Sequence, residues 1–364
     1  MYFDSRPKTT REDLYDRDEQ MSHFLDVLSY APLVVVTGLR RTGKTSFLNV
    51  ALAESNYPYA TLDLRGLPYN PSYADVVRRL EVAFKVISRK WFSDLAEALK
   101  HVGGVTILGS ELSFQWGKPG IDLPELFAKI DDWATKKGSK FLMAFDEIQL
   151  VRGDKWLLRF LAHVIDSYHN VVLAVTGSEV GVLFDFLGFE KTDSPLYGRH
   201  FVQIHMDNFS PSAAEDFLTK GFKQVRIMAP LNVIEYAVKR LDGVVGWLTL
   251  FGVRCRDKGK CSKEIVDEVA SEAGRLARDE AAKVVEMSKR YGTILNFLAR
   301  VDEASWSQIK ASLETEEARS ITNSAVSTLI KNLTNIGIIS SAHGTYSIAD
   351  PLLVSQIKEE PFPK

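Results

Sequence analysis

The chain contains little cysteine and no long apolar segment. Cys255 and Cys261 are its only two cysteines, and no histidine lies near them in sequence to complete a tetrahedral zinc site. No apolar run approaches the roughly 18 residues of a membrane-spanning helix. The N-terminus carries Asp4, Arg6 and Lys8 where a signal peptide would have an apolar region. We therefore expect reduced thiols and a cytoplasmic protein without a membrane partner.

The chain also lacks an excess of charge of either sign. Its formal net charge is −2 at pH 7, so nothing draws the whole molecule toward nucleic acid or an anionic membrane. Partners of that kind would require a local patch. At 364 residues and 45% hydrophobic content, the chain has apolar material for more than one core, and its length favours two or three domains.

A phosphate-binding loop is the strongest local signal. Residues 38–45 read GLRRTGKT, the G-x-x-x-x-G-K-[ST] pattern, between the apolar run 33–36 and a helical run from residue 46. Glycines permit backbone angles at which consecutive N–H groups point at phosphates, and the helix N-terminus adds positive charge. Since the loop uses its backbone, the side chains of its two arginines are expected to be solvated. The predicted ligands are ATP or ADP with Mg²⁺, held by Gly38, Arg41, Thr42, Gly43, Lys44, Thr45 and Ser46.

Two acidic residues supply what hydrolysis needs beyond binding. Asp146 and Glu147 follow the apolar run 141–145, at the carboxyl end of a predicted strand, where open α/β sheets place their ligands. Asp146 and the Thr45 hydroxyl are the predicted metal ligands, in the Walker-B arrangement. Glu147 is the predicted group that orients or deprotonates the attacking water.

Further candidates follow other predicted strands. Thr176 and Ser178, after the run 171–175, could each contact the γ-phosphate or the water, and the alternative for Ser178 is a helix cap. Arg199 is a candidate cation for the transition state, within its own subunit or toward a neighbour, against the alternative of a surface arginine. Asp63 also ends a strand, and there we favour a structural role.

The order of elements predicts three domains. Strands alternate with helices through residue 205, which predicts a parallel α/β sheet, with one long helical tract over 72–100 and a β-hairpin over 104–116. Several helices follow, and then three helices and a hairpin with the outline of a winged helix. The predicted fold is therefore a parallel-sheet P-loop NTPase core (1–207), a helical lid (208–280) and a C-terminal winged helix (281–364).

These motifs together resemble the archaeal ATPase family, a branch of the STAND group of P-loop NTPases related to AAA+ proteins. The resemblance covers nearly the whole chain and rests on the following runs: RPK (6–8), DLYDR (13–17), TGLRRTGKT (37–45), FDE (145–147), TGSE (176–179), SPLYGR (194–199) and GWL (246–248). It implies nucleotide between core and lid, with Arg17 near the adenine. Many STAND proteins carry Gly-x-Pro in the lid, whereas this chain has Gly246-Trp247-Leu248.

The sequence favours a slow, Mg²⁺-dependent ATPase that acts as a nucleotide-dependent switch. The alternative is a nucleotide-regulated DNA-binding protein, and a small-molecule P-loop kinase is weaker. Residues 281–364 contain nine Lys or Arg and nine Asp or Glu, and the helix predicted over 323–335 offers only Lys331 as a cation. A basic cluster in the lid (Arg254, Arg256, Lys258, Lys260 and Lys263) is interpreted as a solvated helix end. We therefore expect a protein partner, through the lid, the hairpin or the winged helix.

Overall fold

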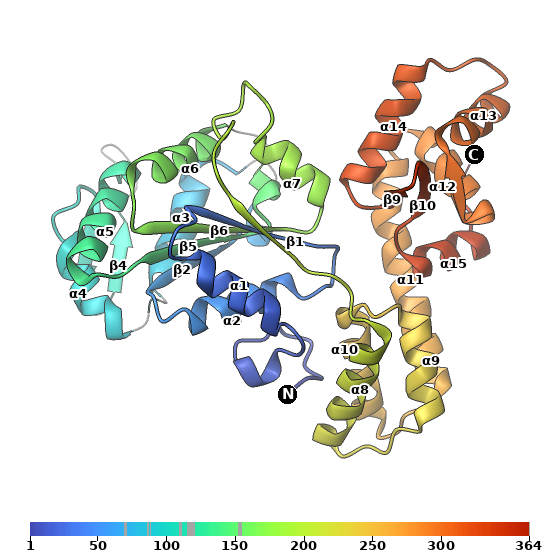
Figure 1. The fold of residues 1–364 in the computed structure, drawn as a ribbon, viewed down its shortest axis with the longest axis horizontal. Helices are drawn as coiled ribbons and strands as arrows, with labels where there is room; N and C mark the ends of the chain where they lie inside the picture. The colour runs from blue at the N-terminus through green and yellow to red at the C-terminus, as the bar shows by residue number, and fades with distance from the viewer. Residues whose placement is uncertain are drawn as a thin grey trace.

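A computed structural model describes residues 1–68, 71–85, 87, 89–108, 111–114, 121–151 and 155–363. It confirms the predicted fold class: an α/β core with a parallel sheet, followed by a helical region and a winged helix (Figure 1). Among the helices described, none is long and apolar enough to cross a membrane.

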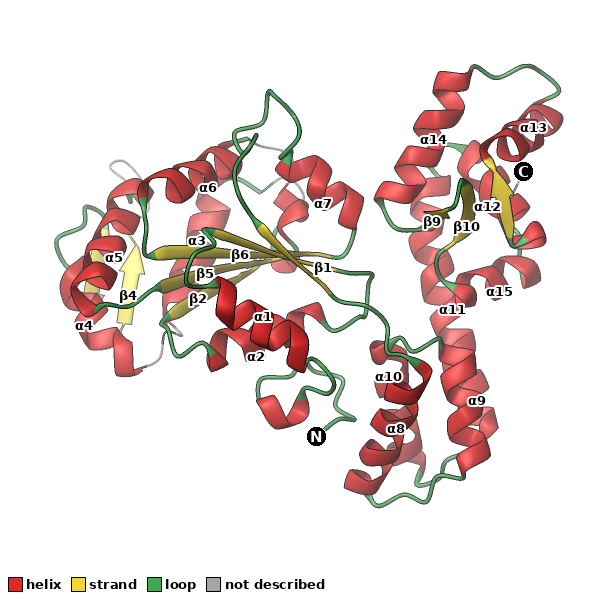
Figure 2. Cartoon of the chain, viewed as in Figure 1, coloured by secondary structure: helices red, strands yellow, loops and turns green. Residues whose placement is uncertain are grey.

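The core is built on a five-stranded parallel sheet in the order β2-β5-β6-β1-β7. Its strands are almost wholly apolar because helices cover both faces. Helices α1 and α2 pack on one face and α3 to α7 on the other (Figure 2). The strands are β1 (Leu33–Thr37), β2 (Tyr59–Asp63), β5 (Phe141–Asp146), β6 (Val171–Gly177) and β7 (Val202–His205). The helices are α1 (Asp18–Val27), α2 (Lys44–Glu54), α3 (Tyr73–Lys85), α4 (Arg89–Leu99), α5 (Leu123–Lys137), α6 (Trp156–Ser167) and α7 (Val180–Leu187).

Two expectations for the core are refined. The tract predicted as one helix over 72–100 forms two helices, α3 and α4, whose apolar faces both contribute to the same core. The predicted hairpin is confirmed as β3 (Val105–Leu108) paired antiparallel with β4 (Glu111–Phe114), and its turn at 109–110 and its end at 115–116 lie outside the described residues. The described residues also form three short 3₁₀ helices: Arg11–Asp13, Leu64–Gly66 and Ile148–Val151.

The lid has its own apolar core, formed by α8 (Pro211–Val225), α9 (Leu231–Leu241), α10 (Val245–Lys258) and the first half of α11 (Lys263–Val285). Phe3, from the N-terminal segment, is fully buried in it against Gly221 and Gly252, where added Cβ atoms would lie 2.3 and 2.2 Å from its ring. These two glycines therefore form a notch for one aromatic ring, through which the N-terminal segment packs against the lid.

The second half of α11 belongs to the winged helix. Its residues pack with α12 (Lys289–Val301), α13 (Trp306–Glu317), α14 (Asn323–Asn335) and α15 (Pro351–Glu359). The wing is a three-stranded sheet in the order β8-β10-β9, with β8 (Glu303–Ser305), β9 (Ile339–Ala342) and β10 (Thr345–Ile348). The boundary that we expected at residue 280 thus falls inside one continuous helix.

Candidate functional site

The phosphate loop connects β1 to α2 through residues in unusual backbone conformations. Gly38, Arg41 and Gly43 have φ values of +146°, +66° and +93°. A Cβ at Gly38 would lie 2.4 Å from the carbonyl oxygen of Met206, so only glycine fits there. Loops with this backbone conformation turn consecutive N–H groups toward one point and so form a cradle that binds anions.

Lys44 lies inside this cradle. Its side chain is buried, and Nζ donates hydrogen bonds to the carbonyl oxygens of Gly38 (2.9 Å) and Leu39 (2.6 Å). Burial lowers the pKa of Lys44 to about 8, although nearby Glu147 and Asp146 act in the opposite direction. The loop therefore holds a cation whose charge is costly until an anion arrives.

The predicted metal ligands are adjacent. Thr45 Oγ1 donates to Asp146 Oδ2 at 2.9 Å, and Thr176 Oγ1 donates to Asp146 Oδ1 at 2.6 Å. Burial raises the pKa of Asp146, and these hydrogen bonds oppose that shift. A hydroxyl and a carboxylate are the hard oxygen ligands that Mg²⁺ prefers, so the pair fits this ion. The described residues contain no group of three or more His, Cys, Asp or Glu side chains suited to another metal.

Glu147 is held by a network of donors. Its Oε2 accepts hydrogen bonds from Gln149 Nε2 (2.6 Å), Ser178 Oγ (2.9 Å) and the Ser178 backbone N–H (3.2 Å). Its own N–H donates to Thr176 Oγ1 at 2.9 Å, and its φ is +59°, a left-handed value that costs energy outside glycine. Ser178 thus orients Glu147, and the helix cap weighed for it is not formed, because α7 has no side-chain N-cap.

Arg65 was not anticipated from the sequence. It follows β2, where its guanidinium lies 3.1 Å from Asp146 Oδ2 and also pairs with Asp63. Gln149 was not anticipated either. Its position two residues after Glu147 indicates that its amide could reach the Glu147 carboxylate.

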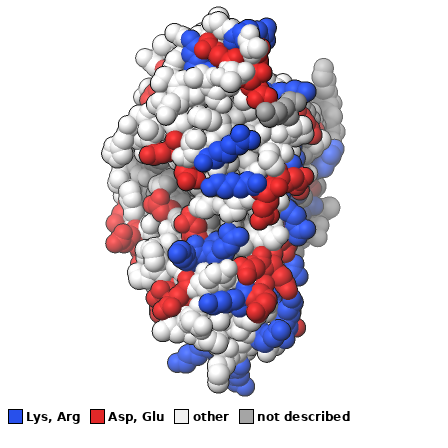
Figure 3. Space-filling view, turned by 90° about the vertical axis from the view of Figure 1, so that its right-hand side faces the viewer, with Lys and Arg blue, Asp and Glu red and all other residues white. Residues whose placement is uncertain are grey.

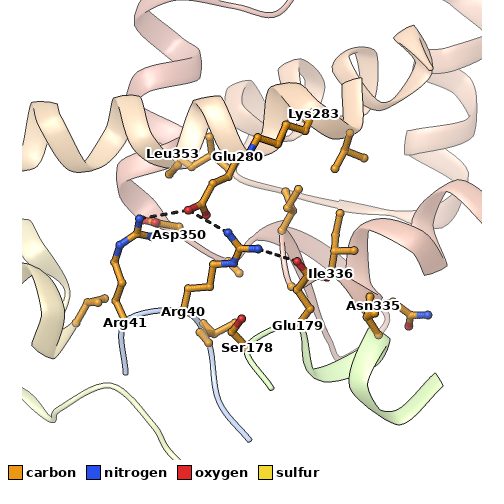
Figure 4. Close-up of a pocket in the computed structure, with 18 of the residues that line it drawn as sticks. Arg40, Arg41, Ser178, Glu179, Glu280, Lys283, Asn335, Ile336, Asp350 and Leu353 are labelled. Atoms are coloured by element: carbon orange, nitrogen blue, oxygen red, sulfur yellow. Dashed lines mark hydrogen bonds and ion pairs between the residues drawn. The ribbon is translucent and has the colours of Figure 1, made fainter. Parts of the chain in front are cut away.

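The loop arginines keep part of the exposure that we expected, 43% for Arg40 and 29% for Arg41, but both also form ion pairs that the sequence did not indicate. Both bind Glu280 of α11, with Arg40 Nη1 at 3.0 Å and Arg41 Nη2 at 3.2 Å (Figure 4). Arg40 also pairs with Glu179 at 2.7 Å, and the Arg41 guanidinium lies 4.3 Å from the ring centre of Trp247. These contacts border a cavity of about 570 Å³ between the loop, the lid and the winged helix.

The lid touches the phosphate loop through backbone. The N–H of Gly246, at the start of α10, donates to the Arg41 carbonyl oxygen at 3.0 Å. A Cβ on Gly246 would lie 2.7 Å from Arg41 Cβ, so the glycine permits this approach. The lid thus contacts the loop although the chain lacks the Gly-x-Pro that many STAND proteins carry.

Three other predicted nucleotide contacts are engaged with protein atoms. Arg17 is buried, stacks on Phe209 and donates to the carbonyl oxygens of Asp207 (2.7 Å) and Thr42 (3.4 Å). Thr42 Oγ1 donates to Leu39 O at 2.9 Å, and Ser46 Oγ accepts the Lys8 N–H at 3.0 Å. Arg17 therefore braces the loop against the start of the lid.

Arg199 does not join this group. It precedes β7 and pairs with Asp166 near the end of α6, both at the amino ends of the parallel strands. The phosphate loop lies at the carboxyl ends, on the opposite edge of the sheet. The structure therefore gives Arg199 no contact with the loop of its own chain.

Comparison with known proteins identifies the families that the chain resembles. Residues 14–251 match the family described as "ATPase domain predominantly from Archaea", and residues 286–349 match the winged helix-turn-helix domain at the C-terminus of MCM proteins. A search of curated proteins found no match.

Similar solved structures cover almost the whole chain. The Walker-type ATPase PABY2304 of Pyrococcus abyssi is 31% identical, with a TM-score of 0.84 over 98% of this chain and 100% of that one. The Aeropyrum pernix ORC2 protein, in ADPNP-ADP complexes, is 11% identical, with a TM-score of 0.60 over 95% of this chain and 94% of that one, a likeness of fold alone. With its phosphate loop and paired carboxylates on the same sheet edge, the chain is a nucleotide-binding P-loop protein that belongs to the family of ATPase domains found predominantly in Archaea.

Proposed function

We propose that the protein is a Mg²⁺-dependent ATPase that acts as a switch, with its nucleotide state read by the lid and the winged helix. The observation that carries the proposal is Glu280, which binds both arginines of the phosphate loop. Glu280 lies on α11, the helix shared by the lid and the winged helix. The assignment to the STAND group, the domain limits and a cytoplasmic location belong to the same proposal.

Each residue of the site has a role in hydrolysis. Backbone N–H groups of the loop and Lys44 bind the phosphates, and Thr45 with Asp146 would hold Mg²⁺. When bound, the ion neutralises charge that develops on the transferred phosphoryl group. Glu147 orients and deprotonates the water, while Ser178 and Gln149 hold its carboxylate. In this scheme Arg199 serves a neighbouring subunit, as it does not reach its own site.

The winged helix is docked on the core at a second place. Gly181 of α7 lies so close to α14 that an added Cβ would be 2.3 Å from the Cα of Asn335. The winged helix therefore contacts the core at two places. One is the pairing of Glu280 with the arginines of the phosphate loop, and the other is the packing of α14 against α7. We infer that a change of the loop between nucleotide states alters the Glu280 pairs and releases this docking.

Hydrolysis is tested by steady-state ATP turnover with and without Mg²⁺. We expect wild-type turnover that requires Mg²⁺, and a loss of at least about 100-fold in Glu147→Gln, since its amide cannot accept the proton from water. Equal background rates in the two proteins would refute the catalytic assignment.

Coupling is tested by hydrogen exchange of α14 in the ATP-bound and ADP-bound protein. Glu280→Gln weakens the pairs with Arg40 and Arg41, and Gly181→Ala forces α14 away from α7. We expect faster exchange in α14 for both variants and a smaller difference between nucleotide states. Glu272→Gln is the control, because Glu272 pairs with Arg254 within the lid at 3.0 Å. Unchanged exchange in Glu280→Gln would refute the switch.

The charges favour a protein partner over DNA. Basic and acidic side chains interleave across the face of the lid and winged helix drawn in Figure 3. In the basic cluster of the lid, Arg254 pairs with Glu272, Arg256 with Asp257 and Lys258 with Glu268. Such pairs leave little net charge for phosphate contacts. A mobility-shift titration at low salt tests this, and we expect no binding of duplex DNA at micromolar protein.

A further inference from the structure

Arg65 occupies a defined place beside the metal ligands. It follows β2, whose last residue, Asp63, is in register with Asp146 at the end of β5. Two carboxylates therefore lie side by side at the edge of the sheet. Arg65 donates from Nε to Asp63 Oδ1 at 2.9 Å and from Nη2 to Asp63 Oδ2 at 2.8 Å, and the same Nη2 lies 3.1 Å from Asp146 Oδ2.

The three neighbours of Asp146 differ in what they provide. Thr176 and Thr45 donate neutral hydrogen bonds, whereas Arg65 supplies the only full positive charge in contact with this carboxylate among the described residues. Asp146 is almost completely buried, while the Arg65 side chain is 48% exposed. The arginine thus approaches the buried carboxylate of Asp146 from the solvent side, while the Arg65 guanidinium donates two hydrogen bonds to Asp63. Asp63 also accepts the Arg65 backbone N–H at 3.0 Å, which fixes the turn.

We propose that Arg65 is the internal counter-cation of Asp146 and sets the Mg²⁺ affinity of the site. Without metal the guanidinium is shared between Asp63 and Asp146, and with metal it stays on Asp63 alone. A guanidinium and a divalent ion repel each other when they contact one carboxylate, so each weakens the binding of the other. Arg65 is a positioning residue in this account, since it acts through Asp146. The inference rests on the proposed metal site at Thr45 and Asp146.

Two substitutions should shift metal affinity in opposite directions. Arg65→Gln removes the competing charge and should tighten metal binding about three- to tenfold, a modest factor because the arginine is half exposed. Asp63→Asn releases Arg65 to bind Asp146 fully and should weaken metal binding by a similar factor. Arg65→Lys keeps the charge without the two-pronged geometry and should fall between wild type and Arg65→Gln.

The measurement is direct binding of Mn²⁺, detected by electron paramagnetic resonance in the presence of saturating ADP. Arg6→Gln is a matched control: Arg6 donates to Asp4 from the same three nitrogens, at 3.0, 3.1 and 2.7 Å, and among the described residues it pairs with no second carboxylate. Affinity for ADP without metal reports that each variant is folded. An Mn²⁺ affinity that is unchanged or weaker in Arg65→Gln would overturn the inference while leaving the ATPase proposal intact. Absence of Mn²⁺ binding by the wild type would refute the metal site and the inference together.

Discussion

Nucleotide affinity should fall as the pH rises through the pKa of Lys44. Burial lowers that pKa to about 8, and the ammonium is the form that attracts a phosphate. The diphosphate of ADP is almost fully ionised above pH 7.5, so it adds little titration of its own. The protonated fraction of a group with a pKa of about 8 falls from about 0.8 at pH 7.5 to about 0.1 at pH 9. We therefore expect ADP to bind roughly eightfold more weakly at pH 9 than at pH 7.5.

The same shift predicts proton uptake. Bound phosphates stabilise the ammonium and raise its pKa again, so the protein should take up about 0.8 proton per ADP at pH 8.5. Isothermal titration calorimetry in two buffers with different ionisation enthalpies measures both quantities, without Mg²⁺ so that Asp146 plays no part. Lys44→Met should bind weakly and lose the pH dependence. A wild-type affinity that does not change from pH 7.5 to 9 would refute the lowered pKa.

Two substitutions test the contacts of the lid. Phe3→Ala empties the notch between Gly221 and Gly252 and should lower the free energy of unfolding of the lid by about 3–5 kcal/mol, and Phe3→Leu should recover most of this stability. The measurement is unfolding by denaturant, and a loss of under about 1 kcal/mol in Phe3→Ala would contradict this packing. Gly246→Ala places a methyl group 2.7 Å from Arg41 Cβ and should weaken ADP binding, measured by the same calorimetry. The control is Gly103→Ala, whose Cβ would make an ordinary 3.7 Å contact. Equal ADP affinity in the two variants would show that the lid does not support the loop.

The parts of the site that sequence could predict are those fixed by local backbone chemistry. Glycines at positions 38 and 43 and the run Lys44-Thr45 define the loop, because its conformation depends on consecutive residues. Asp146 was predictable from the buried strand that precedes it. Its neighbours Thr45 and Thr176 follow from a parallel sheet that brings the carboxyl ends of its strands together.

Long-range partners could not be predicted. Glu280 lies more than 200 residues from Arg40 and Arg41, and nothing in its own segment distinguishes it from the other acidic residues of α11. The contact between Arg65 and Asp146 could not be predicted either. It depends on the register of β2 and β5, which brings Asp63 beside Asp146 and is determined only when the sheet forms.

Differences in the extent of elements have local causes. The three-residue strand β8 is too short for an alternating pattern, so the wing was predicted with two strands. The domain limit that we propose at residue 280 lies within α11, because the apolar residues of this helix contribute to two successive cores.

The continuity of α11 makes it a lever. At 1.5 Å per residue its 23 residues span about 34 Å, and Glu280 lies about 25 Å from its first turn. If the helix pivots at Glu280, a rotation of about 10° moves its lid end by about 4 Å, more than the length of a hydrogen bond. A small displacement of Arg40 and Arg41 would thus be amplified, and the lid and the winged helix would swing in opposite directions about the phosphate loop.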